Sequence, residues 1–190
     1  MTLEKYSRPY CHRFQKVIID RPEKENPELG DPHGNEEAGC FIGDTPILMA
    51  DGRTKNIDAI AVGDQVMARD ENTGTTAVGA VARIFRHHVA ETLLLRMEGG
   101  EIVETTAAHR FAAEEQGFIS AGQLRPGDRL STHDEQGSEV VSTETRSAEM
   151  AVYNLSIDRL HTFFVGGSGL WVHNVKKADP HEPEDEIPKP

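Results

Sequence analysis

Between Cys40 and Asn174 the chain is a succession of short apolar segments separated by turn-forming residues, and this pattern limits its fold more than any other feature. Asp51-Gly52, Asn72-Thr73-Gly74 and the glycine-rich stretch 166–169 are turn signals. Many short strands at this spacing, without a long amphipathic helix pattern, are typical of an all-β fold. The expected strands are 46–49, 65–68, 79–85, 92–97, 102–105, 128–132, 140–145, 151–157, 162–165 and 170–173, with helical turns at 54–60 and 120–124.

A short pattern occurs twice in this body. Ile60-Ala-Val-Gly63-Asp64-Gln-Val66 matches Leu124-Arg-Pro-Gly127-Asp128-Arg-Leu130, which lies 64 residues later. The two copies are either unrelated Gly-Asp turns or equivalent parts of two similar halves. Each copy follows a glycine, Gly52 or Gly117, and leads into an expected strand, which favours the second interpretation.

The two flanks differ from this body in composition. Of the ten prolines, four lie in residues 1–38 and four in the last eleven residues. Segments 21–38 and 176–190 have too few apolar residues to offset the entropy lost on ordering. We therefore expect one domain at 40–174, a flexible segment and linker at 1–39, and a disordered, acidic, Pro-rich tail at 175–190.

Charge and hydropathy exclude several classes of partner. The net charge is −12, which repels phosphate backbones and disfavours nucleic-acid binding. No apolar run approaches the length of a membrane span, and residues 1–15 lack the apolar stretch of a signal peptide. We expect a monomer made in the cytoplasm, with neither nucleic acid nor membrane as a partner; its final location stays open.

The cysteines and histidines do not form a familiar metal pattern. Cys11 and Cys40 allow one disulfide, but two cysteines do not make a secreted disulfide scaffold. With His12 and His33 they give the spacing C-H-x20-H-x6-C, which fits no common zinc site. We expect no metal and no cofactor. His87-His88 is interpreted as a solvated turn.

Cys40 is the first candidate for chemistry. A lone cysteine is more often a small buried apolar residue than a nucleophile. Here, however, it follows Gly39 at the end of the linker and opens the body, where its thiol can close a five-membered ring on the Gly39 carbonyl. That attack converts the amide into a thioester. The step is uphill, so the fold must distort the bond and protonate the departing nitrogen.

Three further elements are weak alone. In Thr106-Ala-Ala-His109, the imidazole can donate a proton and Thr106 can hydrogen-bond the strained peptide, although such histidines are more often surface or core residues. In His173-Asn174, the asparagine side chain can attack its own carbonyl, form a succinimide and release the next residue, with the histidine assisting. Alone, a His-Asn pair after a strand more often only forms a turn. His161 could activate the Asn174 amide or be an exposed strand-edge residue.

Taken together, the order and spacing of these elements resemble the Hint superfamily, which includes inteins, bacterial intein-like domains and hedgehog autoprocessing domains. The opening from Cys40 to Gly52 is similar to the N-terminal block, and Thr106-Ala-Ala-His109 occupies the T-x-x-H block. Segments 152–165 and 169–174 match the two C-terminal blocks. The resemblance spans 40–174 and is strongest to the intein-like domains that precede toxin modules in bacterial polymorphic toxins. It implies a horseshoe-shaped all-β fold with pseudo-two-fold symmetry, and it leaves open export as part of a larger toxin system.

Several departures from the family limit the chemistry. Inteins need Cys, Ser or Thr after the final Asn, and this chain has Val175, so ordinary splicing is not expected. Asn154 stands where inteins commonly have an acidic residue, and an amide is no general base. Sterol transfer is disfavoured because hedgehog-type domains do not end in His-Asn. The body has no room for an endonuclease insert.

We therefore expect single-turnover self-cleavage at both domain edges, with no multiple-turnover activity on other proteins. Cys40 attacks Gly39, assisted by Thr106 and His109, and water or a small thiol opens the thioester. Asn174 cyclises, releasing the segment that starts at Val175. The substrates are the chain's own flanks. Two alternatives stay open: a degenerate Hint domain kept as a β-scaffold or spacer, and a cysteine protease acting in trans through Cys40 and His109.

Overall fold

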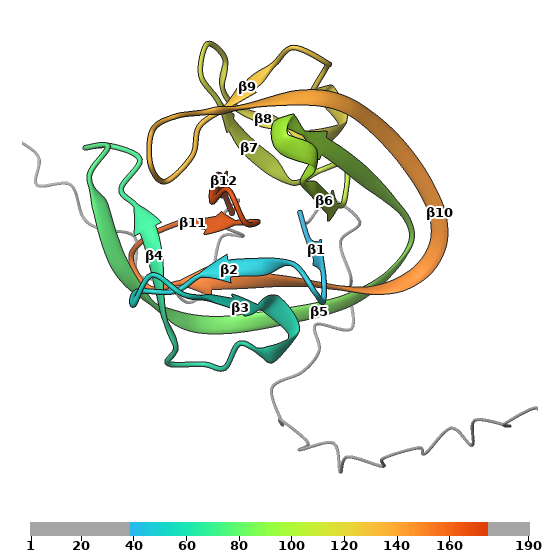
Figure 1. Cartoon of the computed structure of the whole chain (residues 1–190). Helices are drawn as coiled ribbons and strands as arrows, with labels where there is room; N and C mark the ends of the chain where they lie inside the picture. The colour runs from blue at the N-terminus through green and yellow to red at the C-terminus, as the bar shows by residue number, and fades with distance from the viewer. Residues whose placement is uncertain (1–38, 175–190) are drawn as a thin grey trace, which may run out of the picture.

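The computed structural model describes residues 39–174 as an all-β domain, as the sequence predicts (Figure 1). The expected disorder at 1–38 and 175–190 falls outside the described residues and stays a prediction. Within 39–174, no helix has the length and apolar character needed to span a membrane. The strands are β1 (Phe41–Ile42), β2 (Pro46–Leu48), β3 (Thr54–Asn56), β4 (Gln65–Arg69), β5 (Thr76–Met97), β6 (Ile102–Thr105), β7 (Arg110–Ala113), β8 (Gly117–Ser120), β9 (Arg129–Leu130), β10 (Ser138–Ile157), β11 (Thr162–Val165) and β12 (Leu170–His173), with 3-10 turns at η1 (Ile57–Ala59), η2 (Glu98–Gly100) and η3 (Ala121–Gln123).

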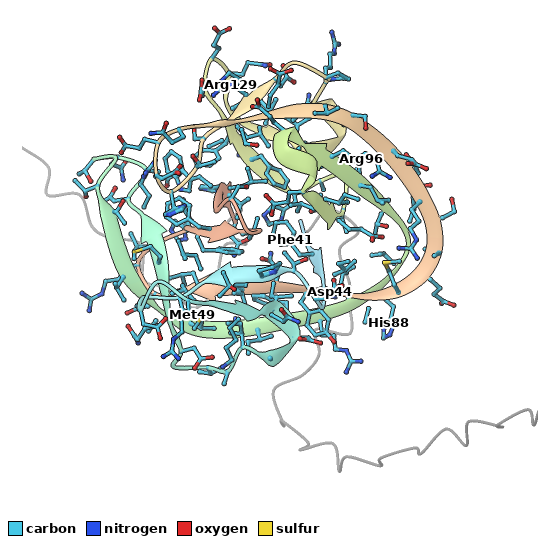
Figure 2. The ribbon with its side chains drawn as sticks, in the orientation of Figure 1. Phe41, Asp44, Met49, His88, Arg96 and Arg129 are labelled. Atoms are coloured by element: carbon cyan, nitrogen blue, oxygen red, sulfur yellow. The ribbon has the colours of Figure 1, made fainter. Side chains whose placement is uncertain are left out.

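Two long strands give the domain its horseshoe outline. β5 and β10 run antiparallel side by side and curve around β1, β11 and β12 (Figure 1). The sequence prediction divided each into two strands, which is wrong, and His87-His88 is no turn but the middle of β5, paired with Val152 and Ala151. A polar pair is tolerated there because alternate side chains face solvent; His88 projects outward in Figure 2. Register shifts in the ladder, one of them between Ser147 and Met150, are bulges that help the arms bend.

The two halves repeat the same hydrogen bonds at a constant offset. The β2–β3 hairpin pairs Pro46 with Asn56, and the β7–β8 hairpin pairs Arg110 with Ser120, each residue 64 positions later. The turns η1 and η3 are offset by the same amount. In both halves the aspartate of the Gly-Asp repeat accepts a bond from the amide three residues before it, Asp64 from Ala61 at 2.8 Å and Asp128 from Arg125 at 2.7 Å. The repeat therefore belongs to two equivalent halves, as its flanking residues indicated.

Four strands were missed by the sequence prediction: β1, β3, β7 and β8. β1 and β3 have only two and three residues, too few for a periodic pattern. β3 and η1 share the segment expected to be a helical turn at 54–60, which is wrong for its first half. The helical turn expected at 120–124 is confirmed as η3.

The topology brings the two ends of the domain to its centre. The sheet order is β3-β2-β11-β12-β7-β9-β10-β1-β6-β5-β4, so β1 lies between β10 and β6 while β12 lies between β11 and β7. Phe41 packs edge-on with Phe111 and Phe163 in the core, and Figure 2 shows it in the interior between the arms. The residues just before β1 and just after β12 are thus held by strands on both sides.

Candidate functional site

Cys40 enters the core immediately before β1 and is 2% exposed. Its amide nitrogen, which belongs to the Gly39–Cys40 peptide, donates a 2.9 Å hydrogen bond to Thr106 Oγ1. Its carbonyl accepts bonds from the Thr106 amide at 2.9 Å and from Thr105 Oγ1 at 2.8 Å. The end of β6 therefore fixes the backbone of Cys40 on both sides of its Cα.

His109 lies in the turn before β7, with its ring buried beneath the core aromatics. The ring centroid is 4.1 Å from that of Phe41, and Phe111 and Phe163 contact it edge-on. Neither ring nitrogen has a hydrogen-bond partner of normal geometry among the described residues. A buried imidazole with two unpaired nitrogens is costly for stability, which is typical of a group held for chemistry.

Burial keeps Cys40 and His109, the two reactive groups at the N-terminal edge of the domain, uncharged. It lowers the pKa of His109 from 6.5 to about 3; the Gly39 backbone opposes the fall and nearby His173 adds to it. Burial also raises the pKa of the Cys40 thiol from 9.0 to about 12. At neutral pH the pair consists of a thiol and a neutral imidazole.

Gly39 lies directly against His109. A methyl group built on Gly39 would lie 2.5 Å from both the Cα and the Nδ1 of His109, closer than van der Waals contact allows. Position 39 therefore accepts only glycine without a shift of the backbone or the ring. This contact brings the residue before Cys40 into the site.

Gly39→Ala should slow the cleavage that the sequence predicts at the Gly39–Cys40 bond by on the order of 100-fold, because a displacement of about 1 Å misaligns the reacting atoms. The rate is measured by mass spectrometry with added thiol. Gly167→Ala is the matched control, since its nearest neighbour would be a Glu101 side-chain oxygen at 3.6 Å. Equal rates for Gly39→Ala and the unchanged chain would show that the contact is irrelevant.

Strand register places Asn174 between two histidines. β12 ends at His173, which pairs with Arg110 of β7, so the next step of that ladder sets Asn174 opposite His109. On the other side, the Asn174 amide donates a 2.6 Å bond to the carbonyl of His161. Asn174 Oδ1 is buried and has no partner among the described residues.

His173 is half-enclosed by aromatic and charged neighbours. Its Nε2 lies 3.0 Å from Glu71 Oε2. Its ring centroid lies 4.9 Å from that of Phe118 and 6.3 Å from that of His161. Its Nδ1 is buried without a partner among residues 39–174. Burial lowers the pKa of His173; Glu71 opposes this, and Arg110 and His161 lower the pKa further.

Asn154 lies on β10 at the edge of the same region. β1 pairs Phe41 with Tyr153, so continuing the register by one residue sets Cys40 opposite Asn154. The Asn154 Oδ1 accepts a 2.8 Å bond from the amide of Leu155. The side-chain amide is thus engaged with its own strand.

The two candidate edges converge on one place, with Gly39 and Cys40 at one side of His109 and Asn174 at the other. Sequence reasoning missed Glu71, Thr105 and Arg110. Glu71 sits in a turn and the other two in strands, and only the folded register brings them to the site.

Two further sequence predictions concern the surroundings. The loop 166–169, expected to be a turn, is held by Glu101, whose carboxylate accepts bonds from the Gly167 amide and from the Ser168 amide and hydroxyl. Among residues 39–174, no group of three His, Cys, Asp or Glu side chains is placed to hold a metal ion. Cys11, His12 and His33 lie outside the described residues.

The family of this domain is known from its sequence. Residues 47–175, more than half of the chain, match the model of the pretoxin HINT domain. The chain belongs to this family. Its Hint domain therefore has an autoprocessing or splicing-type function in general. The match begins after Cys40, so it covers the C-terminal candidates and the T-x-x-H segment but not the first cysteine.

Solved relatives share the fold along nearly their whole length. The bacterial intein-like domain from Clostridium thermocellum is 33% identical with a TM-score of 0.68, covering 71% of this chain and 98% of that one. The DnaB intein from Synechocystis is 21% identical with a TM-score of 0.64, covering 73% and 99%, and shows the fold alone. A curated relative, the replicative DNA helicase DnaB of Rhodothermus marinus, is 30% identical over 120 residues. The match spans only 12% of that helicase.

Proposed function

We propose that this Hint domain cleaves its own backbone at Gly39–Cys40 and at Asn174–Val175, releasing its flanks rather than joining them. The observation that carries the proposal is the convergence of both edges on His109, through the close approach of Gly39 and the register that sets Asn174 opposite it. Reacting groups fixed in one site make each step intramolecular, which can be worth about 7–11 kcal/mol.

At the C-terminal edge, Asn174 Nδ2 attacks the Asn174 carbonyl carbon to form a succinimide, and the bond to Val175 breaks. His173 and His161 lie close enough to assist this step through proton transfer and through the backbone bond to the Asn174 amide. The step needs no side-chain nucleophile at position 175, which is why valine is tolerated there.

At the N-terminal edge, the Cys40 thiol attacks the Gly39 carbonyl, and the proton moves through His109 to the departing nitrogen. Thr106, which already accepts a bond from that nitrogen, orients it. Forming a thiolate and an imidazolium from groups with pKa values of about 12 and about 3 costs roughly 12 kcal/mol before their mutual attraction. This cost disfavours a separate thiolate–imidazolium pair, so the attack and the proton transfer should be concerted.

Incubation of the purified chain tests the proposal. The intact 21.0 kDa species should give way at neutral pH to products cut before Val175, and added thiol should release the segment ending at Gly39. Persistence of the intact mass in both conditions would overturn the proposal.

Two observations favour a second candidate, a degenerate Hint domain that serves as a scaffold. Cys40 and His109 are both neutral and buried, and position 154 carries an amide rather than an acid. An inert but folded chain would support this alternative. Cleavage of other proteins in trans is disfavoured, since Cys40 is 2% exposed.

The family name suggests the biological setting. A domain that frees the segment beginning at Val175 would suit a toxin polypeptide in which release activates or detaches a C-terminal part. Its partners are then its own flanks, with water or a small thiol as acyl acceptor and neither nucleic acid nor membrane involved.

A further inference from the structure

The contact between Glu71 and His173 is unexplained by the features that define the site. Glu71 lies in the turn between β4 and β5, about a hundred residues from His173 in sequence, yet its Oε2 lies 3.0 Å from His173 Nε2. The side chain of Glu71 is 37% exposed and that of His173 only 14%. The pair therefore joins a surface turn to the C-terminal edge of the domain.

The structure anchors this turn where it meets the site. The amide of Arg69 donates to Thr162 Oγ1 at 3.1 Å, and the Thr162 hydroxyl donates to the Arg69 carbonyl. The buried guanidinium of Arg69 lies over the rings of Phe164 and Trp171, at 5.4 and 5.2 Å. Glu71 follows this anchor by two residues, so its position against β12 is built into the fold.

The turn itself is closed by Asp70. Its Oδ1 accepts bonds from the amides of Asn72 at 2.8 Å and Thr73 at 3.2 Å, and the Gly74 amide donates to its carbonyl at 2.8 Å. These bonds flank Glu71 on both sides and limit the conformations open to it. A carboxylate held this way can orient an imidazole with little loss of entropy.

His173 is surrounded by charges of both signs. Glu71 faces it from the β4–β5 turn, Arg110 from β7, and His161 from the segment before β11, while His109 lies in the turn just before β7. Glu71 is the group among these that favours the protonated ring; Arg110 and His161 oppose it. Removing the carboxylate would leave the ring with unfavourable neighbours only.

Resting on the proposed cyclisation of Asn174, we propose that Glu71 is the positioning residue of that step: its carboxylate accepts the Nε2–H of His173, orients the ring and leaves Nδ1 free to accept and return a proton. A carboxylate on one ring nitrogen fixes the tautomer and makes the other nitrogen the reactive one. The Nδ1 of His173 is buried and unpartnered among the described residues, as this role requires.

The proton transfer in this step is balanced by groups of the chain itself. Asn174 Nδ2 forms a bond to the Asn174 carbonyl carbon and gives one proton to His173 Nδ1. The bond from that carbon to the Val175 nitrogen breaks, and the nitrogen takes the proton from Nδ1. The products are a succinimide and a free amine, with no outside reactant.

The first test follows His173 without relying on cleavage. In the full chain carrying Asn174→Ala, which keeps the segment after residue 174 attached, nitrogen-labelled histidine reports the tautomer and midpoint of His173 by NMR. Glu71→Gln should lower the midpoint by about 1 pH unit and reduce the Nε2–H fraction. Glu115→Gln, at an exposed position in the β7–β8 turn, should change neither. An unchanged His173 signal in Glu71→Gln would overturn the proposal.

The second test measures release of the segment after Asn174 across pH in the otherwise unaltered chain. Glu71→Gln should move the limb of the profile governed by His173 to lower pH by about 1 unit, and Glu71→Ala should also lower the maximal rate by on the order of 10-fold. A shifted His173 signal with an unshifted pH profile would overturn the positioning role. A chain that never cleaves, while His173 still responds to Glu71, would instead reject the proposed function, and the positioning role with it.

Discussion

Asn174→Ala should abolish release of the C-terminal segment, a loss of at least on the order of 10³-fold, because the intramolecular nucleophile is removed. The rate of appearance of the peptide beginning at Val175 measures the effect. Asn174 is only partly buried at the end of β12, so the variant should keep the thermal stability of the unchanged chain to within about 1 kcal/mol.

Asn56→Ala is the matched control, since it removes the same side chain from the exposed end of β3. It should cleave at the unchanged rate. Release of the Val175 peptide from Asn174→Ala at an undiminished rate would mean that the bond is cut by another route, such as contaminating protease.

His109→Gln should reduce thiol-induced cleavage at Gly39–Cys40 by about 10²- to 10⁴-fold, the usual contribution of a positioned acid or base. The variant keeps a polar side chain of similar length in the pocket formed by the core aromatics. The readout is the thiol-dependent appearance of the domain beginning at Cys40. His88→Gln, on the exposed face of β5, should be neutral.

His109→Gln also tests the burial of this imidazole independently of cleavage, through the pH dependence of folding stability. The pKa of His109 is lowered to about 3 in the folded chain, so below 6.5 the unfolded chain binds a proton that the folded chain does not. The folding stability present above pH 6.5 should therefore fall as pH drops toward 3, by up to roughly 5 kcal/mol, because the unfolded chain alone takes up this proton. Chemical unfolding across pH should show this acid destabilisation in the unchanged chain and a smaller one in His109→Gln. Identical pH dependence would contradict burial of a neutral imidazole.

Much of the fold follows from local sequence. Strands such as β6, β11 and β12 end where turn residues predict, and the Gly-Asp repeat predicts two halves because each aspartate closes its own local turn. The continuity of β5 and β10 could not be predicted, since their polar middles are stabilised by pairing with each other over a long distance in sequence.

The candidate site also contains residues that could be predicted from local sequence and residues that could not. Residues with a distinctive chemical motif, such as Cys40, His109 and Asn174, could be proposed from order and spacing. The role proposed for Glu71 could not be predicted, because it depends on the anchor between Arg69 and Thr162, which joins residues 93 positions apart. The neutrality of the buried thiol and imidazole is likewise a property of the folded core, not of the motif.

The most direct measurement of self-cleavage is the chemical form of the new end at Asn174. Freshly released product, formed in water enriched in heavy oxygen, should end in a succinimide that is one water lighter than the hydrolysed form and carries no solvent oxygen. The complementary peptide should begin with the free amine of Val175. A product that ends directly in a carboxylate labelled by solvent, or a chain that stays whole, would contradict the account.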